Sequence, residues 1–470
     1  MRFIINQKPN MVSANVMKFL TGKLLLYDEL NLEPKQVMEL TAQKMLRKTP
    51  AIIQNKYTHT CLRCNNRKVS LFGKIPCAKC NKEHIYCRHC IMMGRVMVCE
   101  HLYEWSGPDF TWPKTSNPCK WSGTLTKDQN KAAQRIIHAI SQQERELLLW
   151  AVTSSGKTEM LFPGITYALQ HGLRICIATP RVDVVRELLP RLKRAFPKIE
   201  IEALYGGSES KLGISQLIIA TTHQLFRYKQ AFDLMIIDEI DAFPYHKDKS
   251  LPFATNRAVK ASGTIIYLTA TPRSNYLKKI RNQSLPHIFI PRRYHDKPLP
   301  IPQYMLAFNL EKQMRQKQLP KTFINWYELQ QQKGSSRQLL IFVPTIALAE
   351  QLAKTHKTYF QRFQKSIDFV HAEDKDRELK VNKFRKNKLQ ILITTTILER
   401  GVTFPSVDVV VLDAGHEVFD TAALVQISGR VGRHPKDPDG HVLFIHDGKT
   451  RAMITAVKSL QEMNKRAGFK

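Results

Sequence analysis

Short apolar segments recur along the chain from residue 147 onward, separated by longer stretches in which apolar and polar residues follow each other with helical spacing. The apolar segments are rich in β-branched residues and cover 147–152, 174–180, 216–222, 234–239, 264–272, 338–344, 390–396, 407–414 and 441–447. Continuous apolar runs are typical of strands that are buried on both faces of a parallel sheet. Their alternation with helices predicts βαβ units. The runs form two groups around the polar stretch 297–323, so we predict an α/β protein with two lobes.

The residues before position 147 have a different pattern. Residues 33–48, "EPKQVMELTAQKMLRK", predict a helix in which Pro34 takes a first-turn position. Residues 106–123 are rich in Pro, Ser, Gly and Trp and predict a linker. We therefore expect an N-terminal region of open role over 1–57, a cysteine module over 58–105, a linker over 106–124, a first lobe over 125–295 and a second over 296–470.

The composition of the chain indicates what kind of partner it binds. The 470 residues include 43% hydrophobic residues, enough to form cores, and carry a formal net charge of +32. A surplus of this size favours a polyanionic partner, either nucleic acid or an anionic membrane surface. The sequence contains no apolar run long enough to span a membrane, and its first residues lack the order of a secretion signal, so we expect a cytosolic chain.

The stretch "AVTSSGKTEM", which follows an apolar run, predicts a phosphate-binding loop. A turn through Ser154, Ser155 and Gly156 that leads into a helix aims backbone N–H groups and the positive end of a helix at an anion. Lys157 would reach the β- and γ-phosphates of ATP, and Thr158 would offer its hydroxyl to Mg²⁺. Alanine and serine stand where glycines are usual in such loops, which would alter nucleotide affinity.

Further residues fit the same site. Asp238 and Glu239 end an apolar strand, where ligands bind in open α/β sheets; Asp238 would hold Mg²⁺ and Glu239 would take a proton from the attacking water. Gln129, just before the first helix of the lobe, offers a carboxamide that suits the adenine edge.

The order of motifs resembles superfamily-two helicases and translocases of the DEAD-like kind. The motifs are "AVTSSGKT", "ATPR", "DEID", "TATP", "TTTILERGVTFP" and "QISGRVGR", between residues 120 and 450. The resemblance implies two RecA-like lobes that close on ATP. It implies that Thr269, Ala270 and Thr271 link hydrolysis to lobe movement, and it gives further roles to a glutamine near the γ-phosphate and two arginines reaching across the cleft: Gln426, Arg430 and Arg433. Such arginine fingers are worth on the order of 10³–10⁵ in rate.

The same resemblance implies contacts with a nucleic-acid strand. Thr179, Pro180 and Arg181 match the first-lobe motif that touches the phosphate backbone, and Thr395 lies in the corresponding second-lobe motif. Contacts of this kind position a strand without reading its bases. We expect binding that tolerates sequence and weakens with salt.

Seven of the nine cysteines fall between Cys61 and Cys99. Six of them form Cys-x-x-Cys pairs: Cys61 with Cys64, Cys77 with Cys80, and Cys87 with Cys90. Two such pairs make a tetrahedral thiolate site for Zn²⁺, so we predict at least one structural zinc ion. Which four cysteines share an ion stays open, and a second site could be completed from His84, His89, Cys99 and His101. Redox chemistry is disfavoured because the surrounding pattern is not a thioredoxin-like βαβ unit.

The chain, in which a cysteine module precedes DEAD-like helicase motifs, resembles the ComFA family of late-competence ATPases. The resemblance lies in "YCRHCIMMGRV", "ATPRVDVVREL", "DEIDAFPY" and "QISGRVGR". The resemblance implies an ATPase stimulated by single-stranded DNA. It implies action at the cytoplasmic face of the membrane channel, with other competence proteins as partners, in the uptake of transforming DNA. Two alternatives remain: a replication-restart or repair helicase, and a non-catalytic zinc-dependent nucleic-acid-binding protein.

Overall fold

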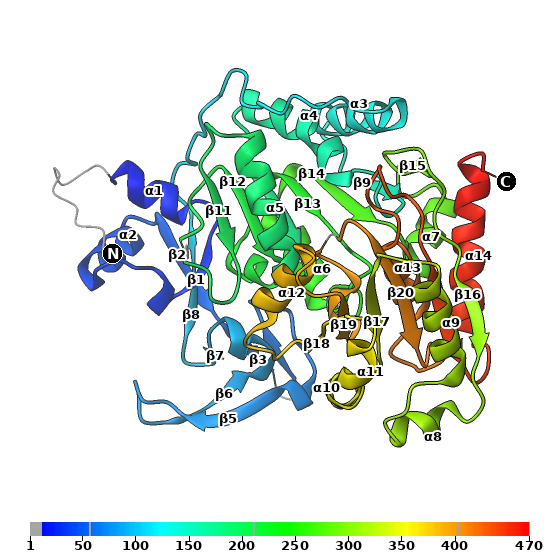
Figure 1. The fold of residues 1–470 in the computed structure, drawn as a ribbon. Coiled ribbons are helices and arrows are strands. Elements are labelled where there is room, and N and C mark those ends of the chain that lie inside the picture. The colour runs from blue at the N-terminus through cyan, green and yellow to red at the C-terminus, as the bar shows by residue number, and fades with distance from the viewer. Residues whose placement is uncertain (1–11, 56–57, 210–211, 403, 470) are drawn as a thin grey trace. The chain divides into compact units, whose positions relative to one another are not determined.

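The computed structural model describes residues 12–55, 58–209, 212–402 and 404–469. The chain divides into two compact units, Met1–Trp150 with Thr158–Ile288 and Ala151–Lys157 with Phe289–Lys470. Each unit contains a parallel sheet with flanking helices (Figure 1). The predicted α/β class with two lobes is confirmed.

The sheet of the first lobe has the strand order β11-β12-β10-β13-β14-β9-β15. Its strands are β9 (Glu146–Ala151), β10 (Ile175–Thr179), β11 (Ile201–Leu204), β12 (Leu217–Thr221), β13 (Phe232–Ile237), β14 (Val259–Thr269) and β15 (His287–Ile290). From β11 through β9, every neighbouring pair is parallel. Strands β10 and β12 are buried at every position, as their continuous apolar runs predict.

Helices flank this sheet and place their apolar faces on it. They are α3 (Lys127–Ser141), α4 (Lys157–Gln170), α5 (Val182–Ala195), α6 (Ser250–Ala258), α7 (Ser274–Arg281) and the 3-10 helix η4 (Thr222–Arg227). Helix α5 is amphipathic. Val185, Leu188 and Leu192 recur with helical spacing and are buried, while Lys193 and Arg194, which lie outside this face, are exposed. Its apolar stripe packs against β10, β11 and β12.

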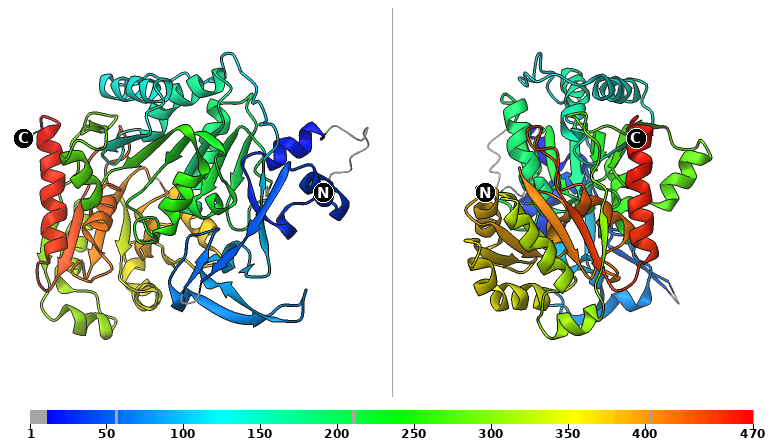
Figure 2. Two further views of the ribbon diagram at one scale, coloured as in Figure 1. Left: turned by 180° about the vertical axis from the view of Figure 1, so that it is seen from behind. Right: turned by 45° about the vertical axis from the view of Figure 1, so that its right-hand side comes forward.

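The second lobe has a parallel sheet in the order β16-β21-β20-β17-β19-β18. Its strands are β16 (Gln303–Leu306), β17 (Gln338–Phe342), β18 (Ile367–Val370), β19 (Ile391–Thr394), β20 (Val407–Leu412) and β21 (Val442–His446). Its helices are α8 (Leu310–Arg315), α9 (Lys321–Gln332), α10 (Ile346–Thr355), α11 (Lys357–Gln361), α12 (Arg377–Arg385), α13 (Thr421–Ser428) and α14 (Arg451–Arg466), with the 3-10 helix η5 (Thr396–Glu399). Figure 2 shows the C-terminal helix α14 alongside these strands, and its buried face packs on α13.

The N-terminal region is a small α/β layer. Its elements are α1 (Ala14–Leu20), β1 (Leu24–Leu26), η1 (Tyr27–Glu29), α2 (Pro34–Ala42), β2 (Leu46–Pro50) and β8 (His101–Trp105). Strand β8 lies between β1 and β2, antiparallel to both. The helix that the sequence predicts over 33–48 ends earlier, at Ala42. Lys44 takes a left-handed φ of 58°, and Leu46 begins β2 with its side chain buried, so tertiary packing ends the helix.

The cysteine segment is built of short strands and single turns between β2 and β8. They are β3 (Ile52–Gln54), β4 (His59–Cys61), η2 (Val69–Leu71), β5 (Phe72–Pro76), β6 (Glu83–Cys87), η3 (Arg88–Met93) and β7 (Val96–Met97). Strands β5, β6 and β7 form an antiparallel sheet, and β3 pairs with β4. The buried cysteines share one apolar core with strands of the first lobe, including Cys176 of β10 and Met235 of β13.

Candidate functional sites

The turn between β9 and α4 has the backbone of an anion-binding loop. Ser154 and Gly156 adopt left-handed φ angles of 59° and 74°, which turns successive N–H groups toward one point at the start of α4. The hydroxyls of Thr153 and Ser154 are buried and find no hydrogen-bond partner among the described residues. Buried hydroxyls without partners are costly unless a ligand satisfies them, so this loop fits a phosphate group.

Lys157 lies folded over the same loop. Its Nζ donates to the carbonyl oxygens of Ala151, at 2.9 Å, and Val152, at 3.1 Å. The loop is also held from outside, because Val152 N donates to Ile290 O and Tyr294 N donates to Ser154 O. The ammonium group is therefore kept at the loop between β9 and α4, and Thr158 follows Lys157 in the first turn of α4.

The two predicted acids follow β13 directly. Asp238 N donates to Ala178 O of β10 at 2.8 Å, and Asp238 Oδ1 accepts from the Glu239 amide at 2.9 Å. Glu239 adopts a left-handed φ of 57°, an uncommon backbone conformation for a residue other than glycine. Both residues are partly exposed.

Asp241, two residues further on, is a functional candidate that the sequence analysis missed. Its carboxylate is buried and accepts from two hydroxyls, Thr269 Oγ1 at 2.6 Å and Thr271 Oγ1 at 2.5 Å. Ala270, the small residue between these threonines, is also buried. The predicted coupling motif is thus bound directly to the last residue of "DEID". The sequence motif already contained Asp241 as its fourth residue.

In the second lobe, the predicted glutamine and arginines lie on or just after α13. Gln426 is buried on the helix. Arg430 is 1% exposed; its Nε donates to Glu399 O at 3.0 Å and its Nη1 to Val402 O. Arg433 is partly exposed and donates to Gly429 O and Val402 O at 3.0 and 3.1 Å. The contacts of Arg430 are those of a residue that fixes the loop after η5, whereas Arg433 keeps solvent access.

Arg433 is also held through its backbone. The Tyr294 hydroxyl donates to Arg433 O at 3.2 Å. On either side of Tyr294, Arg293 Nη2 donates to Val431 O at 2.7 Å and His295 Nε2 lies 3.1 Å from Gly432 O. Burial, with Arg433 nearby, lowers the pKa of Arg293 to about 10. Three consecutive side chains thus fix the segment that carries Arg433.

The residues predicted to contact a nucleic-acid strand lie at or just after the C-terminal ends of two interior β-strands, β10 and β19. Thr179 ends β10, directly opposite Thr221 at the end of β12. The hydroxyls of Thr179 and Thr222 are buried and have no partner among the described residues, as has that of Thr394 at the end of β19, next to Thr395. Pro180 and Arg181 lead from β10 into α5. Thr222 was missed, although "TTHQL" follows an apolar strand just as "ATPR" does.

Gln129 has a structural contact. It is the third residue of α3, and its Oε1 accepts from Thr126 N at 2.8 Å while its own amide N donates to the Thr126 hydroxyl at 3.3 Å. This reciprocal capping box begins the helix.

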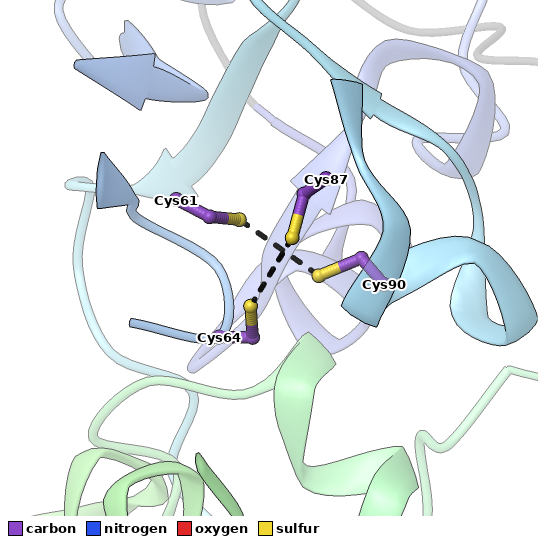
Figure 3. Close-up of side chains that lie close together, drawn as sticks. All are labelled: Cys61, Cys64, Cys87 and Cys90. Carbon is purple, nitrogen blue, oxygen red and sulfur yellow. Dashed lines mark hydrogen bonds between the residues drawn. The ribbon is translucent and has the colours of Figure 1, made fainter. Parts of the chain in front are cut away.

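Cys61, Cys64, Cys87 and Cys90 form a buried cluster (Figure 3). The Sγ atoms of Cys61 and Cys90 are 3.8 Å apart, and those of Cys64 and Cys87 are 3.6 Å apart. Four thiolates bound to a tetrahedral zinc ion at about 2.3 Å lie about 3.8 Å from one another. The cluster fits zinc. The neighbouring thiols of Cys61 and Cys64 hold the pKa of Cys87 below its usual value.

Cys77, Cys80 and Cys99 form a second group, with Cys77 and Cys99 Sγ 3.7 Å apart. Backbone N–H groups of Lys79 and Cys80 hold the pKa of the Cys77 thiol below its usual value. His84 Nε2 is 3.1 Å from Cys80 Sγ, whereas His89 Nε2 bonds to Asp248 at 3.0 Å. The first and third Cys-x-x-Cys pairs therefore share one cluster, and the middle pair joins Cys99.

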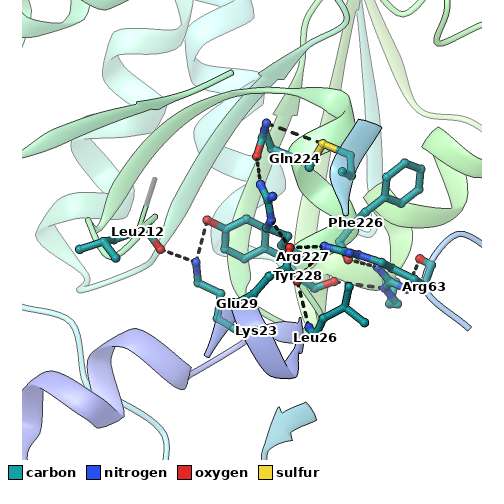
Figure 4. Close-up of polar contacts among 11 residues, drawn as sticks. Lys23, Leu26, Glu29, Arg63, Leu212, Gln224, Phe226, Arg227 and Tyr228 are labelled. Carbon is teal, nitrogen blue, oxygen red and sulfur yellow. Dashed lines mark hydrogen bonds and ion pairs between the residues drawn. The ribbon is translucent and has the colours of Figure 1, made fainter. Parts of the chain in front are cut away.

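A buried ionic network fixes the cysteine segment to the first lobe (Figure 4). Arg63 is 0% exposed, and its Nη2 lies 2.8 Å from Glu29 Oε1; Arg227 Nε of η4 reaches the same oxygen at 2.9 Å. Burial opposes ionisation of Glu29, but the two guanidinium groups outweigh it and lower the pKa of this carboxyl. Arg257 of α6 adds hydrogen bonds to Leu62 O and Arg63 O. The cluster is thus anchored to η4, which begins at Thr222.

The two parallel sheets with helices on their faces, together with the family models that the chain matches, show the fold of a superfamily-two helicase. Family models match three segments: Competence protein ComFA N-terminal domain over residues 7–104, Type III restriction enzyme, res subunit, over 122–274, and Helicase conserved C-terminal domain over 318–435. The fold is also similar to Saccharomyces cerevisiae Dbp5 bound to RNA and ADP BeF3, with a TM-score of 0.55 and 17% identity, covering 72% of this chain and 88% of that one.

Within this class the chain belongs to the ComFA family of competence proteins. It is 44% identical to competence protein ComFA of Bacillus subtilis (strain 168) over 98% of this chain and 97% of the relative. It is 38% identical to competence protein ComFA of Streptococcus pneumoniae over 95% of this chain and 98% of the relative. The predicted family is confirmed, and with it a competence-associated helicase-type ATPase. Among the helices that the structure describes, none is both long and apolar enough to cross a membrane.

Proposed function

We propose that this chain is an ATP-driven motor that moves on single-stranded DNA and drives the uptake of transforming DNA during natural competence. One observation carries the proposal: both threonine hydroxyls of the "TAT" motif donate to the buried carboxylate of Asp241. Because Asp241 lies two residues from Glu239, a change at the hydrolysis site is transmitted to β14 through a short, charge-assisted contact. The net charge of +32 supports a nucleic-acid partner.

The roles of the ATP-site residues follow from their chemistry. Backbone N–H groups of Ser154, Ser155 and Gly156 would bind the phosphates together with Lys157. Mg²⁺ would be held by Thr158 and Asp238 and would neutralise developing charge. Glu239 would accept the proton of the attacking water, and Gln426 would contact the γ-phosphate.

We assign the arginine-finger role to Arg433, because it keeps solvent access while Arg430 is buried against carbonyl oxygens. Gln129 would contact adenine through its carboxamide, which offers one donor group and one acceptor. A guanidinium supplied from the second lobe would make hydrolysis depend on lobe closure.

We assign the contacts with the nucleic-acid strand to residues at or just after the C-terminal ends of β10, β12 and β19. Thr179, Pro180 and Arg181 of the first lobe, with Thr222, would touch the phosphate backbone, and Thr395 would do so from the second lobe. Hydroxyl and amide contacts of this kind hold a strand without selecting its sequence.

The buried cysteine cluster would hold a structural zinc ion. Cys61, Cys64, Cys87 and Cys90 supply four sulfur ligands and leave no open position, which is the arrangement of structural rather than catalytic sites. The ionic network through Arg63 and Glu29 would then transmit the rigidity of that site to η4, beside the proposed DNA contacts. We propose the module to be residues 58–105, between an N-terminal region of 1–57 and a linker of 106–124, with lobes over 125–295 and 296–470.

The proposed partners and cellular location of the motor are those that its family implies. Other competence proteins at the membrane channel would be its partners, and it would act at the cytoplasmic face of the membrane. A motor placed there pulls a strand inward as it steps along it.

The experiment that tests this function measures ATP turnover with single-stranded DNA, duplex DNA and RNA in parallel. We expect single-stranded DNA to stimulate turnover most, and Lys157→Ala to abolish the stimulation while DNA still binds. Lys193→Ala, which removes an exposed lysine of α5, is the matched control and should behave as the unsubstituted protein. Separation of a forked duplex as the main activity would favour a repair helicase instead, and unchanged turnover in Lys157→Ala would remove the phosphate loop from the mechanism.

A further inference from the structure

The hairpin of β5 and β6 carries a turn that repeats the geometry of the buried cysteine cluster. In the buried cluster, Cys61 N donates to Asn66 O at 3.0 Å and Asn65 N donates to Cys61 O at 2.8 Å. In the hairpin, Cys77 N donates to Lys82 O at 2.9 Å and Asn81 N donates to Cys77 O at 2.8 Å. The spacing of donor and acceptor along the chain is the same in both turns.

The match extends to backbone conformation. Asn65 and Asn81 each follow the second cysteine of their pair, and their φ angles are 58° and 53°. Asparagine is among the few residues that tolerate this left-handed conformation. The turn aims both sulfurs of a pair to one side, as a metal site requires.

A third sulfur completes the group. Cys99, between β7 and β8, places its Sγ 3.7 Å from Cys77 Sγ, and the three sulfurs of Cys77, Cys80 and Cys99 all lie within 4.8 Å of one another. A separation of 3.7 Å between two sulfurs is close to the edge of a tetrahedral zinc–thiolate site. All three cysteines are unpaired by disulfide.

His84 on β6 offers a nitrogen ligand next to one of these sulfurs. Its Nε2 is 3.1 Å from Cys80 Sγ, although it does not lie within 4.8 Å of all three sulfurs. Three thiolates and one imidazole are a known structural zinc set, and soft thiolate donors select zinc over the hard cations magnesium and calcium.

We propose that Cys77, Cys80 and Cys99, with His84 as the fourth ligand, bind a second Zn²⁺ ion, separate from the ion of the buried four-cysteine cluster. The second ion joins the tip of the β5–β6 hairpin to the loop that enters β8, closing a segment between Cys77 and Cys99. Because Cys80 is exposed, whereas all four cysteines of the first cluster are buried, the second ion exchanges faster than the first.

The test is metal analysis of the full chain purified under reducing conditions. We expect two zinc ions per chain in the unsubstituted protein and in Cys119→Ser, a matched control whose cysteine lies outside both groups. The double variant Cys77→Ser/Cys80→Ser and the single variant Cys99→Ser should each retain one. Two ions retained in both variants, or one ion in the unsubstituted protein, would overturn the proposal.

Release kinetics give a second measurement on folded protein. With a chromogenic chelator, we expect a fast and a slow phase of equal amplitude, and loss of the fast phase alone in Cys99→Ser. His84→Ala should accelerate the fast phase by about tenfold or more, since a ligand has been removed. A single phase in the unsubstituted protein, or an unchanged fast phase in His84→Ala, would contradict the assignment. Neither measurement depends on ATP or DNA, so failure here is separable from failure of the proposed motor.

Discussion

The hydroxyl of Thr269 donates to the buried carboxylate of Asp241 at 2.6 Å, which ties the end of β14 to the acidic turn after β13. Thr271 reaches the second oxygen of the same carboxylate, and its amide donates to Thr269 Oγ1 at 3.0 Å. Both carboxylate oxygens are thereby engaged by one short motif. A rotation of the acidic turn has to move these threonines with it.

Removing these hydroxyls should weaken the proposed link between the ATP site and β14. In Thr269→Val and Thr271→Val, Asp241 loses a charge-assisted donor worth about 1.5–3 kcal/mol. We expect DNA-stimulated ATP turnover to fall by about tenfold or more, while nucleotide binding measured by equilibrium titration is retained. Thr264→Val is the control, because Thr264 is a buried threonine of the same strand that does not contact Asp241. Equal losses in Thr264→Val would show that the effect is general damage to β14.

The two arginines after α13 should behave differently. Arg433→Ala should lower ATP turnover by about 10³-fold or more, as the loss of an arginine finger does, with little change in the unfolding temperature. Arg430→Ala should lower the free energy of unfolding, because Glu399 O loses a buried donor, at about 1–3 kcal/mol for an unsatisfied group, while Val402 O keeps its contact with Arg433. ATP assays and thermal unfolding of both variants check this. A stable, inactive Arg430→Ala beside an active Arg433→Ala would reverse the two assignments.

If the loop between β9 and α4 binds phosphate as proposed, two substitutions of Ser154 should differ in their effect on nucleotide affinity. Ser154 adopts a φ of 59°, which glycine accepts freely and a β-branched residue does not. Ser154→Gly should bind nucleotide within about twofold of the unsubstituted protein, whereas Ser154→Val should lose affinity by about tenfold or more, as roughly 1–2 kcal/mol of strain predicts. Titration with a fluorescent ATP analogue measures both. Similar affinities in the two variants would mean that the loop changes conformation on binding.

Lys23 gives a prediction about pH. Its Nζ is buried and donates to Leu212 O at 2.6 Å; burial, with Arg174 nearby, lowers its pKa well below the usual value. Between the lowered pKa and about 10.4, the value in the unfolded chain, only the unfolded state binds this proton, so stability rises with pH.

We therefore expect Lys23→Met to rise less steeply in stability from neutral pH toward pH 10 than the unsubstituted protein, measured by urea unfolding. Lys35→Met, at an exposed lysine of α2, should leave the slope unchanged. A slope in Lys23→Met equal to that of the unsubstituted protein would mean that Lys23 is charged in the folded state.

The strand pattern predicted much of this molecule, and the reasons for the misses are physical. Continuous apolar runs such as "QLIIATT" became strands buried on both faces, because a parallel sheet covered by helices has no polar face. The helix predicted to extend to residue 48 failed, because Leu46 contributes more by packing in β2 than by helix propensity. Local pattern does not contain that tertiary contact.

Which cysteine pairs share a cluster could not be predicted from the sequence, for a similar reason. Spacing along the chain makes Cys64 and Cys77 neighbours, but the β5–β6 hairpin brings Cys87 back to Cys64 and carries Cys77 away. His89, a plausible ligand by spacing, instead bonds to Asp248. Asp241 was visible in "DEID", but only its burial beside two threonines reveals what it binds.

The central claim is that ATP hydrolysis moves this chain along a single strand of DNA. The direct measurement is displacement of streptavidin from oligonucleotides that carry biotin at one end or the other. The account predicts ATP-dependent displacement from one end by the unsubstituted protein and by Lys193→Ala, and none by Lys157→Ala. ATP hydrolysis that is stimulated by single-stranded DNA without displacement from either end would contradict it.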